Sequence, residues 1–113
     1  MAAVKDLFFV ARIRETARMV GTPLVFARTP EELKTALADP TDLVILDLTT
    51  NGWDYDAFFA ALEKVTPRPS VLGFTTHALA RATQPLHPRC TRVVTKETLT
   101  QELPELLKTG VAA

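Results

Sequence analysis

The chain has 113 residues, which is in the common size range of a single domain and is long enough to bury one apolar core. Thirteen basic residues balance thirteen acidic ones, so the sequence predicts no general attraction to nucleic acid or to an anionic membrane. Cys90 is the only cysteine, which fits a reducing compartment, and no apolar run approaches the roughly 20 residues of a membrane span. We therefore expect one cytoplasmic domain over residues 1–113.

The first half of the chain predicts three strands, each followed by a helix. The expected strands cover residues 1–5, 24–27 and 43–46, and the expected helices cover 7–20, a segment from residue 29, and 54–65. Asp6 can cap the first helix, Gly21 can end it, and Pro30 suits the first turn of the second helix. The third strand is a continuous Val, Ile and Leu run, which is typical of a strand covered on both faces.

The second half predicts strands over 71–74 and 92–95, with a weakly specified helix at about 79–84 between them and a final helix after them. Pro104 lies inside the final helical pattern, where it lacks an amide hydrogen and clashes with the carbonyl four residues earlier. We expect either a helix from about Thr98 that kinks at Pro104, or a helix that begins only near Leu103. The alternation of strands and helices favours an α/β fold with a five-stranded parallel sheet between helices.

Polar residues follow four of the predicted strands. Asp47 ends the apolar run 43–46, and Asp6, Thr75 and Lys96 follow the first, fourth and fifth strands. Ligands in open α/β sheets gather outside the carboxyl ends of the strands. We therefore expect these four side chains to share one crevice, with Asp47 as the centre of the site.

Five alternating units with Asp6, Asp47, Thr75 and Lys96 at these spacings resemble the receiver domain of bacterial response regulators, and the resemblance covers essentially the whole chain. It implies a flavodoxin-like, doubly wound three-layer sandwich with strand order 2-1-3-4-5. It also implies that Asp47 accepts a phosphoryl group, while Thr75 and Lys96 help to neutralise the phosphoryl charge. Mg²⁺ would be held by Asp6, Asp47 and the backbone carbonyl of Thr49.

The sequence departs from the receiver pattern at one position that matters for the metal. Lys5 stands where the family has a second acid before Asp6, and replacing a carboxylate with an ammonium weakens Mg²⁺ binding. Lys5 could instead lie near Asp47 and favour its ionised form, or it could be exposed if the first strand is shifted by one residue. Further departures occur at Asn51, Tyr55, Thr76, Val93 and Glu97. We therefore expect a degenerate, or pseudo-receiver, domain.

Two other motifs carry less weight. His87 and Cys90 have the spacing of two metal ligands, but a structural zinc site needs four, so we expect no metal there. His77 is expected to be a solvated loop residue. The sequence also lacks the glycine-rich motifs that bind dinucleotides and phosphates, which argues against a nucleotide cofactor.

We therefore expect a stand-alone signalling domain, not an enzyme, that binds other proteins of two-component signalling or a phosphorelay without being phosphorylated. The resemblance implies that its partners contact the fourth and fifth helices and the fifth strand. One alternative is a working phospho-receiver with Asp47 as the Mg²⁺-dependent phosphoacceptor. Another is a small α/β ligand-binding protein or enzyme that uses the same crevice. The sequence leaves open whether the protein forms a homodimer.

Overall fold

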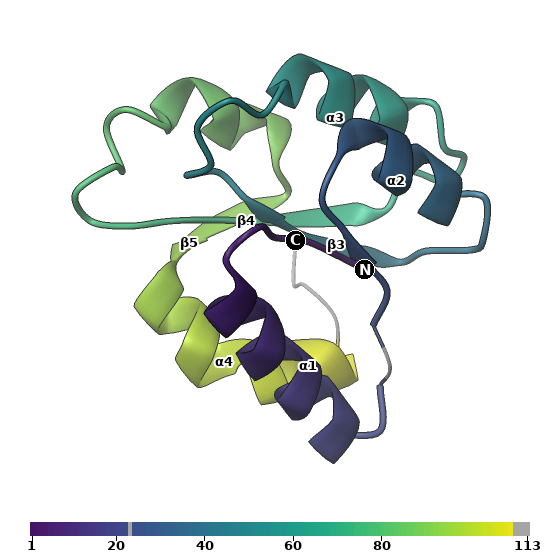
Figure 1. Cartoon of the computed structure of the whole chain (residues 1–113), viewed down its shortest axis with the longest axis vertical. Coiled ribbons are helices and arrows are strands. Elements are labelled where there is room, and N and C mark those ends of the chain that lie inside the picture. Colours follow the sequence, from purple (N-terminus) through teal and green to yellow (C-terminus); the bar gives the residue numbers. More distant parts are fainter. Residues whose placement is uncertain (23, 110–113) are drawn as a thin grey trace.

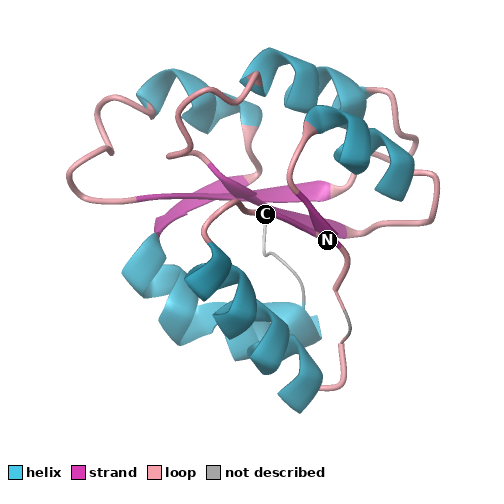
Figure 2. Ribbon diagram, viewed as in Figure 1, coloured by secondary structure: helices cyan, strands magenta, loops and turns pink. Residues whose placement is uncertain are grey.

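The structure is a computed structural model, and it describes residues 1–22 and 24–109. The predicted five-stranded parallel sheet is confirmed, and it has the order β2-β1-β3-β4-β5 that the resemblance implied (Figures 1 and 2). The strands are β1 (Ala2–Ala3), β2 (Phe26–Ala27), β3 (Leu43–Asp47), β4 (Ser70–Thr75) and β5 (Arg92–Thr95). The helices are α1 (Leu7–Met19), α2 (Pro30–Ala36), α3 (Tyr55–Glu63), the 3₁₀ helix η1 (Gln84–Arg89) and α4 (Lys96–Thr109). The fold is therefore a flavodoxin-like, doubly wound α/β sandwich.

Helices cover both faces of the sheet. Figure 1 shows α1 and α4 below it and α2, α3 and η1 above it. Neighbouring side chains of a strand point to opposite faces. Strand β3 therefore contributes Ile45 to the core between the sheet and helices α1 and α4, and it contributes Val44 and Leu46 to the core between the sheet and helices α2 and α3. All three side chains are fully buried. The Val/Ile/Leu run therefore forms a central strand covered on both sides.

Strand β1 is shorter than the predicted segment 1–5. Ala2 and Ala3 pair with β2 on one side and β3 on the other, and they are fully buried, as is Val4. The chain leaves the sheet at Val4, so that Lys5 is exposed and lies outside the strand. Asp6 then starts α1, in agreement with its predicted capping role.

The predicted helix over 79–84 is wrong. Residues 77–83 form turns, and the 3₁₀ helix η1 follows over Gln84–Arg89. Pro85 and Pro88 have no amide hydrogen to donate, and 3₁₀ geometry suits such short segments. Arg89 holds η1 against α3, since its guanidinium contacts Asp56 at 2.7 Å and lies 4.5 Å from the centre of the Phe59 ring.

The final helix differs from both predicted forms, because α4 begins at Lys96 and continues through Pro104 to Thr109. The Thr95 hydroxyl accepts a hydrogen bond from the Thr98 amide at 3.2 Å, which stabilises the first turn. Leucines on both sides of the proline are buried in the core that α4 shares with α1, namely Leu99, Leu103, Leu106 and Leu107. Their burial offsets the hydrogen bond that Pro104 removes.

Gly73 lies in the middle of β4, where the backbone passes close to two side chains. A Cβ atom at this position would lie 2.8 Å from Cys90 Sγ and 3.0 Å from Leu48 Cδ1. Both contacts are tighter than a methyl group normally makes, so the side chains of Cys90 and Leu48 would have to shift to admit one. Cys90, which follows η1, therefore packs directly against the backbone of β4 at Gly73.

We expect Gly73→Ala to lower the free energy of unfolding by about 1–3 kcal/mol, because the added methyl group overpacks the core. Urea denaturation would measure the change. The same substitution in a Cys90→Ala background should cost less, since one of the two close contacts is gone. An equal cost in both backgrounds would show that the Cys90 contact does not matter.

Candidate functional site

The carboxyl ends of the strands meet at one edge of the sheet. Ala3 is in register with Leu46, Asp47 with Phe74, and Thr75 with Thr95. Asp6 and Lys96 follow the ends of β1 and β5 within a few residues. The structure therefore brings all four predicted site residues to the same edge, but it does not join them in one network.

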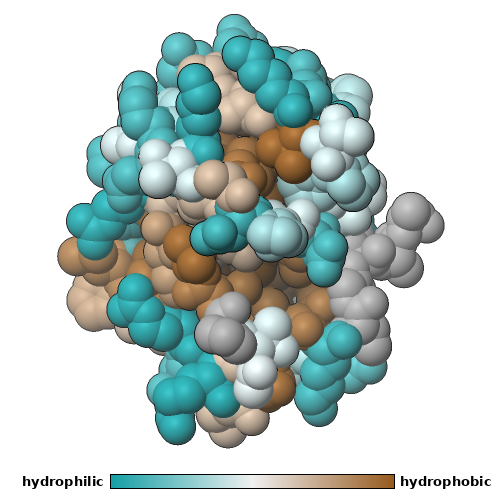
Figure 3. All heavy atoms as spheres, turned by 90° about the vertical axis from the view of Figure 1, so that its right-hand side faces the viewer, coloured by the Kyte–Doolittle hydropathy of each residue, from teal (hydrophilic) through white to brown (hydrophobic). Residues whose placement is uncertain are grey.

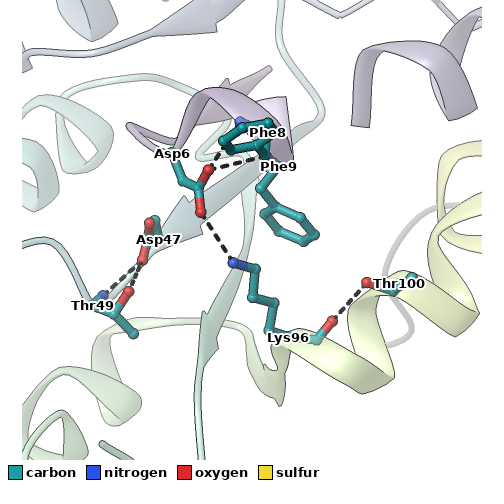
Figure 4. Close-up of polar contacts among 7 residues, drawn as sticks. All are labelled: Asp6, Phe8, Phe9, Asp47, Thr49, Lys96 and Thr100. Atoms are coloured by element: carbon teal, nitrogen blue, oxygen red, sulfur yellow. Dashed lines mark hydrogen bonds and ion pairs between the residues drawn. The ribbon is translucent and has the colours of Figure 1, made fainter. Parts of the chain in front are cut away.

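Asp6 and Lys96 form an ion pair with each other (Figure 4). The Lys96 ammonium lies 3.3 Å from Asp6 Oδ2 and 4.7 Å from the centre of the Phe9 ring. Asp6 Oδ1 accepts hydrogen bonds from the amides of Phe8 and Phe9 at 2.9 and 3.3 Å. The Phe9 amide, together with Lys96, holds the pKa of Asp6 below its ordinary value. Both oxygens of this carboxylate are thus already engaged.

Asp47 is 5% exposed and is held by the residue two positions further on. Its Oδ1 accepts a hydrogen bond from the Thr49 amide at 2.8 Å and another from the Thr49 hydroxyl at 2.6 Å (Figure 4). No described residue donates to Oδ2. Thr49 therefore satisfies the carboxylate locally, in the manner of a turn residue, and no lysine in the described ranges pairs with it.

Tyr55 braces the loop that follows Asp47. Its hydroxyl donates to the backbone carbonyl of Asp47 at 2.7 Å and accepts from the Thr50 amide at 3.1 Å. Burial raises the pKa of Tyr55 to about 12, so the hydroxyl stays protonated and can donate at neutral pH. In the sequence Tyr55 is a departure from the receiver pattern, but no local motif indicated this contact across eight positions.

Thr75 points away from Asp47. Asp47 is in register with Phe74, and successive side chains of a strand alternate between faces, so Thr75 leaves the sheet on the opposite face. Its hydroxyl is buried and accepts a hydrogen bond from Thr83 Oγ1 at 3.0 Å. Thr83 Oγ1 also lies 3.0 Å from His87 Nε2. Thr83 and His87 hold Thr75 under η1, a partnership that the sequence did not indicate.

Lys5 takes the second of its two expected positions. Its side chain is exposed, and no hydrogen bond or ion pair links it to Asp47 or to any other described residue. The charge of Asp47 is therefore not compensated by this ammonium. Lys5 is exposed because β1 ends at Ala3 and the buried segment ends at Val4.

The donor set at this edge does not fit Mg²⁺ well. Within residues 1–22 and 24–109, no group of three or more His, Cys, Asp or Glu side chains could hold a metal ion. Both oxygens of Asp6 are engaged, and the Thr49 hydroxyl and amide face the Asp47 carboxylate. Burial raises the pKa of the Cys90 thiol to about 11, so the free thiol stays protonated at neutral pH.

A separate cavity lies at the opposite, amino ends of the strands. It has a volume of about 550 Å³ and is lined in part by Met1, Leu24, Val25, Leu43 and Leu106. Figure 3 shows apolar side chains gathered in the middle of the face beside β2, between hydrophilic ones above and below. Val25 is 61% exposed there. The cavity is remote from Asp47 and contains none of the predicted site residues.

Comparison of the chain with models of known protein families, with curated proteins and with solved structures gives no match. None of the helices in the described ranges has both the length and the apolar character needed to cross a membrane. The function must therefore be argued from the fold and from the side chains at the sheet edge.

We expect Asp47→Ala to lower the free energy of unfolding by about 1–3 kcal/mol, because it leaves the amide and hydroxyl of Thr49 without their acceptor. Asp47→Asn keeps an acceptor oxygen and should cost less. Asp42→Ala, at an exposed acid before the same strand, is the matched control and should change stability by no more than about 0.5 kcal/mol. A gain in stability on Asp47→Ala, measured by urea denaturation, would instead indicate a strained carboxylate.

Proposed function

We propose that this chain is a stand-alone receiver-like signalling domain that acts by binding another protein and is not switched by phosphorylation. The observation that carries the proposal is the position of Asp47 at the carboxyl end of the central strand β3, with Asp6 and Lys96 at the same edge. The strand order and the three layers support the same assignment. The cytoplasm is the compartment that we propose for it.

The contacts of these residues support independence from phosphorylation. Phosphoryl transfer to a carboxylate requires charge neutralisation by a metal and by a lysine that reaches the acceptor. Here Lys96 pairs with Asp6, and the Thr75 hydroxyl is bonded to Thr83 on the other face of the sheet. Lys5 replaces one of the acids that would attract the metal. Each group needed for transfer is thus changed or engaged elsewhere.

An amide NMR titration with Mg²⁺ and beryllofluoride, a mimic of the phosphoryl group, tests this proposal. We expect the signals of Asp47 and Thr49 to stay unchanged in the wild-type protein, because Lys5 opposes metal binding. Lys5→Asp places a carboxylate next to Asp6 and should make the same signals respond to Mg²⁺. Lys34→Asp makes an identical charge change on α2, where it should have no such effect.

The possible results separate the three functions under discussion. Mg²⁺-dependent shifts near Asp47 in the wild type would replace our proposal with a working phospho-receiver. A response of Lys5→Asp alone would support a receiver-like site that Lys5 has silenced. A lack of response in all three proteins would remove the receiver assignment and favour an unrelated ligand-binding protein or enzyme of the same fold.

The surface that we propose for the partner comprises η1, β5 and α4. Strand β5 is at the edge of the sheet, so one side of it is not paired with any other strand of the described residues. In the family pattern the fourth helix contributes to this surface, and here η1 and the turns before it take its place. This replacement changes the shape of the surface and gives it a specificity of its own.

We expect the immobilised wild-type domain and Asp47→Asn to retain the same protein from a native extract, in equal amounts and whether or not Mg²⁺ and a phosphoryl donor are present. The reason is that the proposed surface does not include Asp47. Quantitative mass spectrometry of the retained proteins gives the measurement. Loss of the partner on Asp47→Asn, or capture only with the phosphoryl donor, would contradict phosphorylation independence.

A further inference from the structure

A second cavity lies between α1 and α4 at the carboxyl ends of β4 and β5. Its volume is about 310 Å³, and it is lined by Phe9, Arg12, Thr76, His77, Thr95, Lys96, Glu97 and Thr100. Figure 4 shows that the Phe9 ring and the Lys96 side chain lie together between the two helices, with the Lys96 ammonium directed toward Asp6. Lys96 therefore separates this cavity from the edge that carries Asp6.

One cation in the cavity lining lacks a partner. Lys96 lines the cavity but is paired with Asp6, which leaves Arg12 and the acid Glu97 as the other charged residues of the lining. The Arg12 guanidinium makes no ion pair or hydrogen bond with any described residue, whereas Arg18, Arg89 and Arg92 are each paired with a carboxylate. The guanidinium at the cavity is therefore free to bind an anion from solution.

The rest of the lining is suited to an apolar group. Phe9 and three threonines, Thr76, Thr95 and Thr100, are among the lining residues and contribute apolar atoms. The volume is at the small end of the range of about 300–1,000 Å³ in which small-molecule sites usually fall. A body of the size of one aromatic ring fits this space.

We propose that this cavity binds a small organic monocarboxylate with an aromatic or branched apolar body. The carboxylate would accept two hydrogen bonds from the Arg12 guanidinium, whose planar fork matches its geometry. The apolar body would lie against Phe9, between α1 and α4. Glu97 disfavours a second negative charge on the ligand, because its carboxylate offsets the added attraction of a dianion to Arg12 and leaves the larger cost of dehydrating the dianion uncompensated.

The inference does not depend on the receiver-like function, because none of its arguments involves Asp47. It adds a chemical input to the domain. The ammonium of Lys96 lines the cavity and also pairs with Asp6, which caps α1. A bound carboxylate would therefore compete with Asp6 for Lys96 and be sensed at the first turn of α1.

Amide NMR titration of the full chain with benzoate tests the site, with benzyl alcohol as the uncharged probe and phenyl phosphate as the dianionic one. We expect benzoate to shift the signals of Thr76, His77, Thr100 and Phe9 saturably, with a Kd on the order of 1 mM, as is usual for so small a ligand. Benzyl alcohol and phenyl phosphate should each bind at least about tenfold more weakly, because one lacks the charge and the other carries the second charge that Glu97 disfavours.

Three variants make the test specific. Arg12→Gln should weaken benzoate binding at least about tenfold, since it removes the bidentate partner of the carboxylate. Arg28→Gln changes another exposed arginine away from the cavity and should leave binding unchanged. Glu97→Gln should strengthen the binding of benzoate and bring phenyl phosphate within range. Arg12 and Glu97 are exposed, so the amide spectra of these variants should show an intact fold.

Several results would overturn the proposal. The first three are an absence of saturable shifts in the wild type, equal binding of benzoate by Arg12→Gln, and shifts that map to another part of the molecule. Binding of benzyl alcohol as tightly as benzoate would also overturn it, because the site would then be a mere apolar gap. Saturable shifts at the cavity that Arg12→Gln removes and Arg28→Gln preserves would support it.

Discussion

The burial of β3 on both faces is the constraint on which the rest of the structure depends. Val44, Ile45 and Leu46 are fully buried between two helical layers, and the strand has β1 on one side and β4 on the other. Such burial fixes the register, because a slip by one residue would move each apolar side chain to the wrong face. Asp47 is consequently held at the edge of the sheet, where the chain can first turn toward solvent.

The sequence predicted this arrangement well because hydrophobic runs and turn residues determine it. The alternation of strands and helices and the common edge of Asp6, Asp47, Thr75 and Lys96 follow from runs whose period and length are visible in the chain, while the strand order was implied by the resemblance to receiver domains. The partners of these four residues could not be predicted in the same way. Lys96 pairs with Asp6, and Thr75 pairs with Thr83. The direction of each side chain reverses when a strand end moves by one residue, and the sequence does not define the strand ends that closely.

The two helical corrections have a similar origin. Proline content favoured a break in the last helix, but the leucines that α4 buries against α1 outweigh the missing hydrogen bond at Pro104. Between β4 and β5 no comparable apolar stripe exists, so the prolines decide the outcome and a 3₁₀ helix forms. Local propensity therefore decided the structure only where tertiary burial was weak. The receiver assignment is a separate matter, and it is a prediction from the spacing of a few residues.

The distribution of charge at the carboxyl edge suggests where an input to this domain can act. At the carboxyl ends of the strands, the Asp6 carboxylate and the Lys96 ammonium neutralise each other, and the Asp47 carboxylate accepts a hydrogen bond from the Thr49 amide. On the neighbouring side, between α1 and α4, Arg12 lines a cavity and its guanidinium has no counter-ion among the described residues. A carboxylate ligand would give the Arg12 guanidinium a partner, whereas Asp6 and Lys96 already have each other. Lys96 both lines this cavity and pairs with Asp6. A ligand in the cavity would therefore change the ion pair between Lys96 and Asp6.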